Sequence, residues 1–357
     1  MYTKRIAGII GLFVIAGIAV YGFLQFNSSV SNTSAPVAQN TGLPNAVAEE
    51  SALPQTEASG DVRGATTDVH PISLPALMDK TFDGREFTVG RVLGTNSAYT
   101  RYYITYMSGS LNISGIMNVP TGDGPFPVLI LNHGYIDPAV YTNGRGLKRE
   151  QDYLARRGYV VIHPDYRNHA ESDDDPEYEV NFRLGYTEDV INVIKAVQAA
   201  GLSYVDGSRI GMLGHSMGGG VTQNVLVVAP DLVQAAVLFA PVSRNAVENY
   251  ERWTERRPEV ARQIVERFGT PAENPEFWKN ISASTFFDRI QAPVMIHHGT
   301  TDESVPIEWS DRLTDQLQSL EKSVEYFVYQ NQPHEFTSSW GQVMQRTVDF
   351  FDTHVKG

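Results

Sequence analysis

The sequence predicts an α/β fold: a doubly wound, mostly parallel sheet with antiparallel strands at one edge and a small helical insertion. The first observation is a series of short, continuous apolar runs, the pattern of parallel strands buried on both faces. The second is that helical periodicity alternates with these runs, since crossovers between parallel strands run through helices. The apolar runs are 128–131, 159–162, 210–213, 235–239, 294–296 and 324–328.

Antiparallel strands are expected in residues 71–120, before the first apolar run. Residues 86–89 and 102–106 are rich in aromatic and β-branched side chains, and Gly109 makes a turn before a third such stretch at 111–117. Hairpins at one edge of the sheet are the simplest arrangement of these segments.

The helices between the later strands have recognisable boundaries. A helix over 147–157 is stopped by Gly158, and Thr187 is expected to cap a helix that Gly201 ends. Two further helices are expected near the end of the chain, at 309–320 and about 338–354.

The alternation breaks between about residues 242 and 288. A charged helix is expected over 247–268, followed by a second short segment at 274–278. This helical insertion is either a small lid over the carboxyl edge of the sheet or a pair of surface helices, and the sequence leaves both open.

Composition bounds the class of protein. A chain of 357 residues is long enough for one α/β domain with an appendage. Its net charge of -13 argues against nucleic acid or anionic lipid headgroups as main partners. The sequence has no cysteine, which excludes disulfides, thiolate catalysis and cysteine-based zinc sites.

The N-terminus predicts a membrane anchor. Lys4 and Arg5 precede an uncharged apolar run from Ile6 to about Phe26, and about 20 helical residues cover the roughly 30 Å of a hydrocarbon core. A cleaved signal peptide is the alternative, although the best small-x-small site, Ala46-Val47-Ala48, lies far downstream. No Lys or Arg follows until Arg63, so the positive-inside rule places the rest of the chain outside the cytoplasm.

The expected organisation therefore has three parts: an anchor or signal peptide at 1–26, a linker at 27–70 and a catalytic domain at 71–357. The linker is rich in Ser, Ala, Thr, Asn, Pro and Gly with little periodicity, a composition that predicts disorder. The protein is expected to be a single-pass membrane protein with its catalytic domain outside the cytoplasm, or else secreted.

A candidate nucleophile lies in Gly214-His215-Ser216-Met217-Gly218. This Gly-x-Ser-x-Gly stretch follows the apolar run 210–213 and precedes a helix-like run at 221–228. Strand, sharp turn and helix together form a nucleophile elbow, which exposes the Ser216 hydroxyl above the sheet. The alternative is a plain glycine-rich turn.

A catalytic acid and base are expected at later strand ends, in the order Ser, Asp, His. Asp302 follows the run 294–296, and His334 follows the run 324–328. In open α/β sheets, residues at the carboxyl ends of the strands meet at one edge, so Ser216, Asp302 and His334 are expected to form a triad. Glu303 is the adjacent alternative acid.

An oxyanion hole needs two donors near the nucleophile. The first is the amide of Met217, at the start of the helix after the elbow. The second is the amide of Tyr135 in the loop Asn132–Tyr135, with the Tyr135 hydroxyl as an alternative.

Other reactive side chains favour structural interpretations, so neither a metal nor a cofactor is expected. His163, His215 and His297 lie at strand ends, where packed histidines are common, and no metalloprotease spacing occurs. The acidic run 171–177 lacks the full pattern of a calcium loop and is read as solvated. There is no phosphate-cradling or dinucleotide fingerprint.

These motifs resemble the α/β-hydrolase superfamily and, within it, the catalytic domain of prolyl oligopeptidase-like serine peptidases. The resemblance covers about residues 100–357 and implies an α/β-hydrolase fold and hydrolysis through an acyl-enzyme. Larger family members have a β-propeller before this domain, for which the chain has no room, and Glu335 replaces the usual glycine after the histidine. The motifs are at 114–120, 125–127, 133–135, 214–219, 298–306 and 333–336.

The expected function is that of a serine hydrolase acting on a small-molecule or peptide substrate. Peptidase and carboxylesterase remain open, because both use one triad and differ in the substrate pocket. A binding protein with an inactive hydrolase fold and a transacylase that excludes water are the remaining alternatives.

Overall fold

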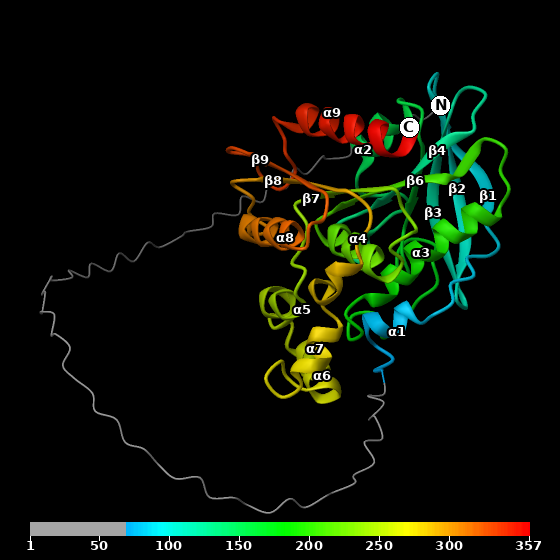
Figure 1. Ribbon diagram of the computed structural model, residues 1–357. Helices are drawn as coiled ribbons and strands as arrows, with labels where there is room; N and C mark the ends of the chain where they lie inside the picture. Colours follow the sequence, from blue (N-terminus) through cyan, green and yellow to red (C-terminus); the bar gives the residue numbers. More distant parts are fainter. Residues whose placement is uncertain (1–68) are drawn as a thin grey trace, which may run out of the picture. The chain divides into compact units, whose positions relative to one another are not determined.

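One open sheet organises the residues that the structure, a computed structural model, describes, namely 69–357 (Figure 1). Its strand order is β1-β2-β3-β5-β4-β6-β7-β8-β9. From β5 to β9 neighbouring strands are parallel, and β1 to β3 join the sheet through antiparallel pairs. The strands are β1 (Thr88–Thr95), β2 (Tyr99–Ser108), β3 (Leu111–Pro120), β4 (Phe126–Asn132), β5 (Val160–Pro164), β6 (Val205–His215), β7 (Ala235–Phe239), β8 (Val294–Gly299) and β9 (Val324–Tyr329).

This architecture confirms the doubly wound α/β fold predicted from the apolar runs. All residues of β5, β7 and β8 are buried, because helices cover both faces of the sheet. The two edge strands differ from these: β1 has exposed side chains along most of its length, and β9 is only partly buried. As the first strand in the order, β1 pairs only with β2, so its other side is an edge without a partner strand.

Two layers of helices enclose the sheet (Figure 1). Helices α3, α4 and α8 pack on one face through side chains such as Val190, Val225 and Leu317. Helices α2 and α9 pack on the other face through Leu154 and Val348. The bounds are α1 (Leu74–Met78), α2 (Lys148–Ala155), α3 (Leu184–Ala199), α4 (Met217–Val228), α8 (Ile307–Ser319) and α9 (Trp340–Phe351), with short turns η1 (Pro138–Val140) and η4 (Asp352–Lys356).

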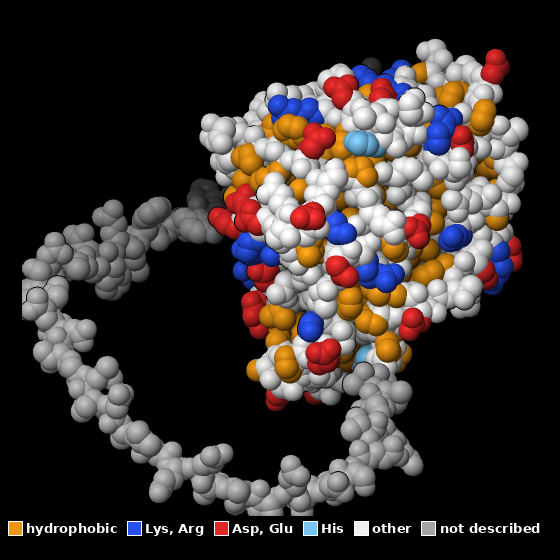
Figure 2. Space-filling view, viewed as in Figure 1, with side chains coloured by type: hydrophobic (Ala, Val, Ile, Leu, Met, Phe, Trp, Pro, Cys, Tyr) orange, Lys and Arg blue, Asp and Glu red, His pale blue; other side chains and the backbone are white. Residues whose placement is uncertain are grey.

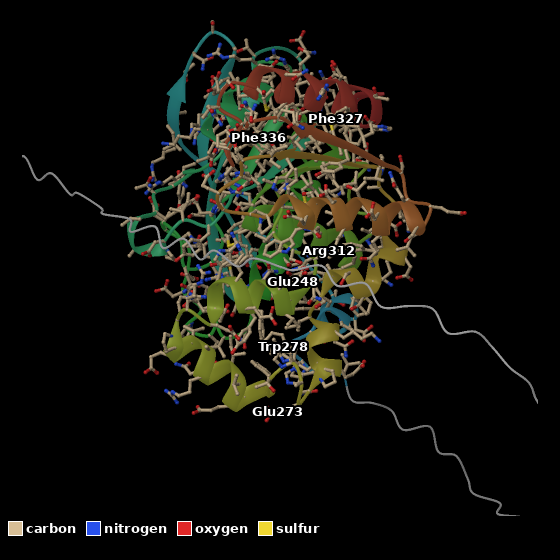
Figure 3. The ribbon with its side chains drawn as sticks, turned by 90° about the vertical axis from the view of Figure 1, so that its left-hand side faces the viewer. Glu248, Glu273, Trp278, Arg312, Phe327 and Phe336 are labelled. Atoms are coloured by element: carbon tan, nitrogen blue, oxygen red, sulfur yellow. The ribbon has the colours of Figure 1, made fainter. Side chains whose placement is uncertain are left out.

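The helical insertion lies between β7 and β8 and has its own aromatic cluster. Phe268 and Phe277 stack with ring centroids 4.5 Å apart, and both contact His70 edge-on. Trp278, buried beside them, is shown within the insertion in Figure 3. The elements are α5 (Ala246–Asn249), the π-helical turn η2 (Tyr250–Thr254), α6 (Pro258–Phe268), α7 (Pro275–Asn280) and η3 (Ala283–Arg289).

Two helix predictions were wrong. Thr187 does not cap α3; the helix begins at Leu184, and the buried Thr187 hydroxyl accepts from Asn224. The turns before α3 run directly into the helix. No side chain caps its first turn, so the sequence has no capping residue that would mark where the helix begins. The single helix expected over 247–268 is divided before Pro258, because proline lacks the N–H that a continuing helix needs and starts α6 instead.

Among residues 69–357, no helix has the length and apolar character that crossing a membrane requires. The anchor predicted at 1–26, and all but the last two residues of the linker predicted at 27–70, lie outside the described residues.

Candidate active site

Ser216 lies in a tight turn between β6 and α4. Its φ of 55° falls in the left-handed region, where a non-glycine residue is strained, and such strain is concentrated at functional sites. A Cβ on Gly214 would lie 2.3 Å from the Gly218 carbonyl oxygen, and a Cβ on Gly218 would lie 2.0 Å from that of Asn132. The turn therefore requires both glycines of the Gly-x-Ser-x-Gly stretch, as a nucleophile elbow does.

Asp302 and His334 meet beyond the ends of β8 and β9. The Nδ1 atom of His334 lies 2.6 Å from Oδ2 of Asp302, and His334 is 7% exposed. The other carboxylate oxygen, Oδ1, accepts from the amides of Ser304 and Val305 at 2.8 Å each. Glu303, the alternative acid, instead accepts from the backbone amide of His334 at 3.3 Å.

A second histidine contacts the same carboxylate oxygen of Asp302. Nε2 of His298 lies 3.2 Å from Oδ2 of Asp302 and 3.1 Å from the Val305 carbonyl oxygen. Both neighbours are acceptors, so this nitrogen has a proton, and Nδ1 contacts the Ser310 hydroxyl at 2.6 Å. Burial alone would raise the pKa of Asp302, but the hydrogen bonds from His298 and His334 hold it well below its ordinary value. The carboxylate therefore stays ionised at neutral pH.

His215, beside the candidate nucleophile, packs directly on the candidate base. Its ring centroid lies 4.5 Å from that of His334, and its Nε2 lies 3.3 Å from the His334 carbonyl oxygen. Burial, followed by the neighbouring His334, lowers the pKa of His215 to about 3. A neutral ring at this position supports the imidazole of His334 without adding a charge. The sequence motif placed His215 next to Ser216 but did not reveal this contact.

The two candidate oxyanion donors lie next to Ser216. Met217 is the first residue of α4, and the loop after β4 that holds Tyr135 passes so close that a Cβ on Gly134 would lie 3.2 Å from the Ser216 Cβ. Within residues 69–357, no protein acceptor bonds either amide. The Tyr135 side chain is 56% exposed, with the guanidinium of Arg183 5.3 Å from its ring centre.

A cavity of about 830 Å³ opens at these residues. Ser216, Met217, Tyr135 and His334 all line it, which places the candidate nucleophile and base at one open space. The helical insertion supplies much of the remaining wall, including Ala246, Asn249, Tyr250, Trp253, Thr254 and Arg257. The segment of the insertion from α5 to η2 thus forms a wall of the cavity, whereas α6 and α7 contribute no residue to its lining.

A contact between the insertion and the acid loop could not be found from sequence. Arg252, in the π-helical turn η2, donates two hydrogen bonds to the carbonyl oxygen of Ser304, from Nε at 3.1 Å and Nη2 at 2.7 Å. Trp253 and Trp309 pack edge-to-face beside it, with ring centroids 5.4 Å apart. Because the Ser304 amide bonds Asp302, the insertion supports the loop that holds the candidate acid.

The carboxylate of Glu335, next to the candidate base, is paired with an arginine. Its side chain is 61% exposed and its carboxylate lies 3.6 Å from Nη2 of Arg149. The same guanidinium donates to the Glu335 carbonyl oxygen at 3.2 Å, so Arg149 ties the histidine loop to α2.

The acidic run 171–177 is used in ordinary ion pairs and hydrogen bonds. Glu171 pairs with Arg91, Asp175 with Arg167 and Glu177 with Arg267. No group of three or more His, Asp or Glu side chains within the described part of the chain is arranged to hold a metal ion.

Comparison with known proteins identifies the family. The model of the prolyl oligopeptidase family matches residues 145–357, more than half of the chain. The chain belongs to the prolyl oligopeptidase family. A curated relative, the uncharacterized peptidase YtmA of Bacillus subtilis (strain 168), is 27% identical over 236 residues, which cover 66% of this chain and 86% of that protein. The family assignment makes this chain a serine hydrolase.

Solved structures share the fold. An acylaminoacyl peptidase of Pyrococcus horikoshii matches with a TM-score of 0.59 and 21% identity, over 72% of this chain and 42% of that one. Est1E of Butyrivibrio proteoclasticus, solved with ferulic acid bound, matches with a TM-score of 0.53 and 19% identity, over 71% of this chain and 99% of that one. The chain thus spans less than half the length of the acylaminoacyl peptidase and nearly all of Est1E.

Proposed function

We propose that this prolyl oligopeptidase-family protein hydrolyses an amide or ester bond through an acyl-enzyme intermediate, with Ser216 as nucleophile, His334 as base and Asp302 as acid. The observation that supports it most strongly is the 2.6 Å contact of Asp302 with His334, which lines the same cavity as Ser216. Such an acid–histidine pair orients the imidazole for proton transfer.

The proton transfers follow from the hydrogen bonds. With Nδ1 of His334 bonded to ionised Asp302, Nε2 is the nitrogen available to take the Ser216 proton as Oγ attacks the substrate carbonyl. The imidazolium then gives that proton to the leaving amine or alcohol. A water molecule attacks the acyl-enzyme in the same way, and the proton returns to Ser216 as the acid product departs.

The tetrahedral intermediates need stabilisation of a negative oxygen. We assign this role to the amides of Met217, which follows Ser216, and of Tyr135, whose loop approaches Ser216 at Gly134; neither amide has a protein acceptor within the described residues. The positive end of α4 adds to the field at Met217. We favour the Tyr135 amide over its hydroxyl, because the Tyr135 side chain extends from the loop with 56% exposure.

Peptidase and carboxylesterase activities are the two forms of this proposal. The first is favoured by the relative of Bacillus subtilis, whose name describes a peptidase. The second is favoured by Est1E, which has ferulic acid bound and matches this chain over nearly its own full length. Neither observation assigns a substrate to the present chain.

A panel of substrates tests the proposal. Residues 69–357 would be purified and assayed with 4-nitrophenyl acyl esters, blocked aminoacyl anilides and free aminoacyl anilides. We expect turnover of at least one class, with kcat lowered by about four to six orders of magnitude in Ser216→Ala. Turnover that is unchanged in Ser216→Ala would contradict the assignment, and the preferred class separates peptidase from esterase.

We also propose that residues 6–26 anchor the protein in a membrane with the hydrolase outside the cytoplasm, since the apolar run is about as long as a hydrocarbon core is thick. Expression of the whole chain followed by membrane fractionation and protease protection tests this. Recovery of a chain shortened at its N-terminus in the soluble fraction would favour a cleaved signal peptide instead.

A further inference from the structure

The charge of the cavity is opposite in sign to that of the whole chain. The protein has a net charge of -13, and Figure 2 shows acidic and basic side chains interspersed over one face of the molecule. The cavity wall, in contrast, has five cationic side chains and three carboxylates. The cations are Lys148, Arg149, Arg183, Arg244 and Arg257; the carboxylates are Glu150, Glu179 and Glu335.

All three carboxylates of the wall already pair with arginine. Nη2 of Arg149 lies 3.5 Å from Oε1 of Glu150 and 3.6 Å from Oε2 of Glu335. The carboxylate of Glu179 pairs with both Arg183 and Arg257. The positive excess is thus not cancelled within the wall. A cleft whose wall has an excess of one sign of charge attracts ligands of the opposite sign.

Arg244 is the partly buried cation that lacks a carboxylate. Its Nε donates to Oε1 of Gln316 at 2.7 Å, but no carboxylate oxygen of the described residues lies within 4.0 Å of its guanidinium. Its Nη1 is buried and has no acceptor among residues 69–357. Burying a charged donor without an acceptor costs free energy that a bound anion would recover.

The carboxylate of Glu248, four positions after Arg244 in the chain, is paired with other residues. Glu248 of α5 pairs with Arg312 of α8 through Oε1, and its Oε2 accepts from the Ser243 hydroxyl. Figure 3 shows Glu248 and Arg312 close together, where the insertion meets α8. This arrangement leaves Arg244 available to a ligand while the insertion stays fixed to the body of the domain.

Other polar atoms of the wall around Arg244 also lack partners. Gln223, on the helix that follows Ser216, is 2% exposed, and its Oε1 has no donor. Oδ1 of Asn249 has none either, although both side chains donate to the backbone of the segment that holds Arg244. Buried polar groups are nearly always hydrogen-bonded, so unpartnered ones that line a cavity indicate a polar ligand.

This wall is next to the nucleophile. The amide of Val242 donates to the carbonyl oxygen of Ser216 at 3.1 Å, and Arg244 follows two residues later. A Cβ on Gly220, on the helix after Ser216, would lie 2.6 Å from the Val242 side chain. Arg244 and Ser216 line the same cavity, so a group bound at Arg244 can be part of the substrate that Ser216 attacks.

We propose that Arg244, with Gln223 and Asn249 beside it, forms a subsite for a carboxylate, so that the preferred substrates are esters or amides with an anionic group near the scissile bond. This inference rests on the proposed hydrolase activity. The guanidinium supplies charged donors to the carboxylate, and the two side-chain carbonyls accept N–H or O–H groups of the same substrate.

Matched substrates test the subsite on the full chain. The acyl-side pair is the 4-nitrophenyl monoester of adipic acid and its methyl ester, which differ in one negative charge. The leaving-group pair is the hexanoyl ester of 4-hydroxybenzoic acid and its methyl ester. We expect the wild-type kcat/KM to favour the free carboxylate of at least one pair by about 10- to 100-fold, the range of one charge-assisted contact. Equal kcat/KM values within both pairs would overturn the inference.

Variants then locate the contact. In Arg244→Gln the preference should fall to about one, and in Arg244→Lys, which keeps the charge, it should be partly restored. Arg257→Gln removes a cation of the same wall that shares Glu179 with Arg183, and should keep the preference within about threefold. Equal losses of the carboxylate preference in Arg244→Gln and Arg257→Gln would show that the overall positive charge of the wall causes the preference. That result would refute a specific subsite at Arg244.

The two proposals can fail separately. Turnover of the neutral esters without a carboxylate preference would leave the hydrolase assignment intact and end the inference about Arg244. If no ester or anilide is turned over and no fluorophosphonate is bound, both fail. The comparison of charged and neutral substrates uses only the wild-type protein. Misfolding of a variant therefore cannot affect that comparison.

Discussion

Arg252→Gln is expected to lower the rate of hydrolysis although the residue lies in the insertion and does not line the cavity. Its two bonds to the Ser304 carbonyl are charge-assisted, and such bonds contribute about 1.5–3 kcal/mol. Ser304 in turn donates to Asp302, so a loosened loop holds the imidazole of His334 less well. If about 2 kcal/mol of this support is lost in the transition state, kcat falls about 30-fold.

The assay is steady-state kinetics on the best 4-nitrophenyl ester, with thermal unfolding as a check of folding. A smaller change in KM than in kcat is expected, because the loop positions catalytic groups rather than substrate. Arg256→Gln is the matched control, since Arg256 is exposed and makes no hydrogen bond or ion pair with the described residues. The reasoning is refuted if the two variants have the same kcat within about twofold.

Two further results are expected. Asp302→Asn should lower kcat by about 10⁴-fold with little change in KM, because the amide favours the wrong tautomer of the base, whereas Glu303→Gln should lower it less than about tenfold; similar losses in both would contradict the geometry. Burial lowers the pKa values of His133, His215 and His297 to about 3. Below about pH 6.5 these histidines are therefore protonated in the unfolded chain but stay neutral in the folded chain. The free energy of unfolding should therefore fall by about 4 kcal/mol for the three between pH 7.5 and 5.5, and equal urea midpoints at both values would disprove it.

The features that the sequence predicted well are those with a local physical signature. Buried parallel strands appear in the sequence as continuous apolar runs, so the strand segments and the positions of Ser216, Asp302 and His334 beyond their ends could be inferred without coordinates. The nucleophile elbow could also be predicted from the sequence, since its turn requires glycine at Gly214 and Gly218, which have no room for a side chain. Each of these inferences needed only a short stretch and the geometry of a parallel sheet.

The features that the sequence did not reveal depend on contacts between distant segments. Arg252 and Ser304 are 52 positions apart, and Arg244 and Gln316 are 72 apart. Neither pair has a periodic pattern that would suggest it. The packing of His215 on His334 required the loops after β6 and β9 to be placed together. The predicted start of α3 was wrong for a related reason: Arg183, in a left-handed conformation, precedes the helix and no side chain caps it.

Covalent labelling of Ser216 is the most direct test of the central claim. Residues 69–357 would be treated with a fluorophosphonate, which reacts with an activated serine, and the adduct located by peptide mass spectrometry. A single adduct on the peptide that contains Ser216, absent in Ser216→Ala and strongly slowed in His334→Ala, is the expected result. An adduct that persists in folded Ser216→Ala, or its absence from a folded wild type that still hydrolyses esters, would contradict the assignment of Ser216 as the nucleophile.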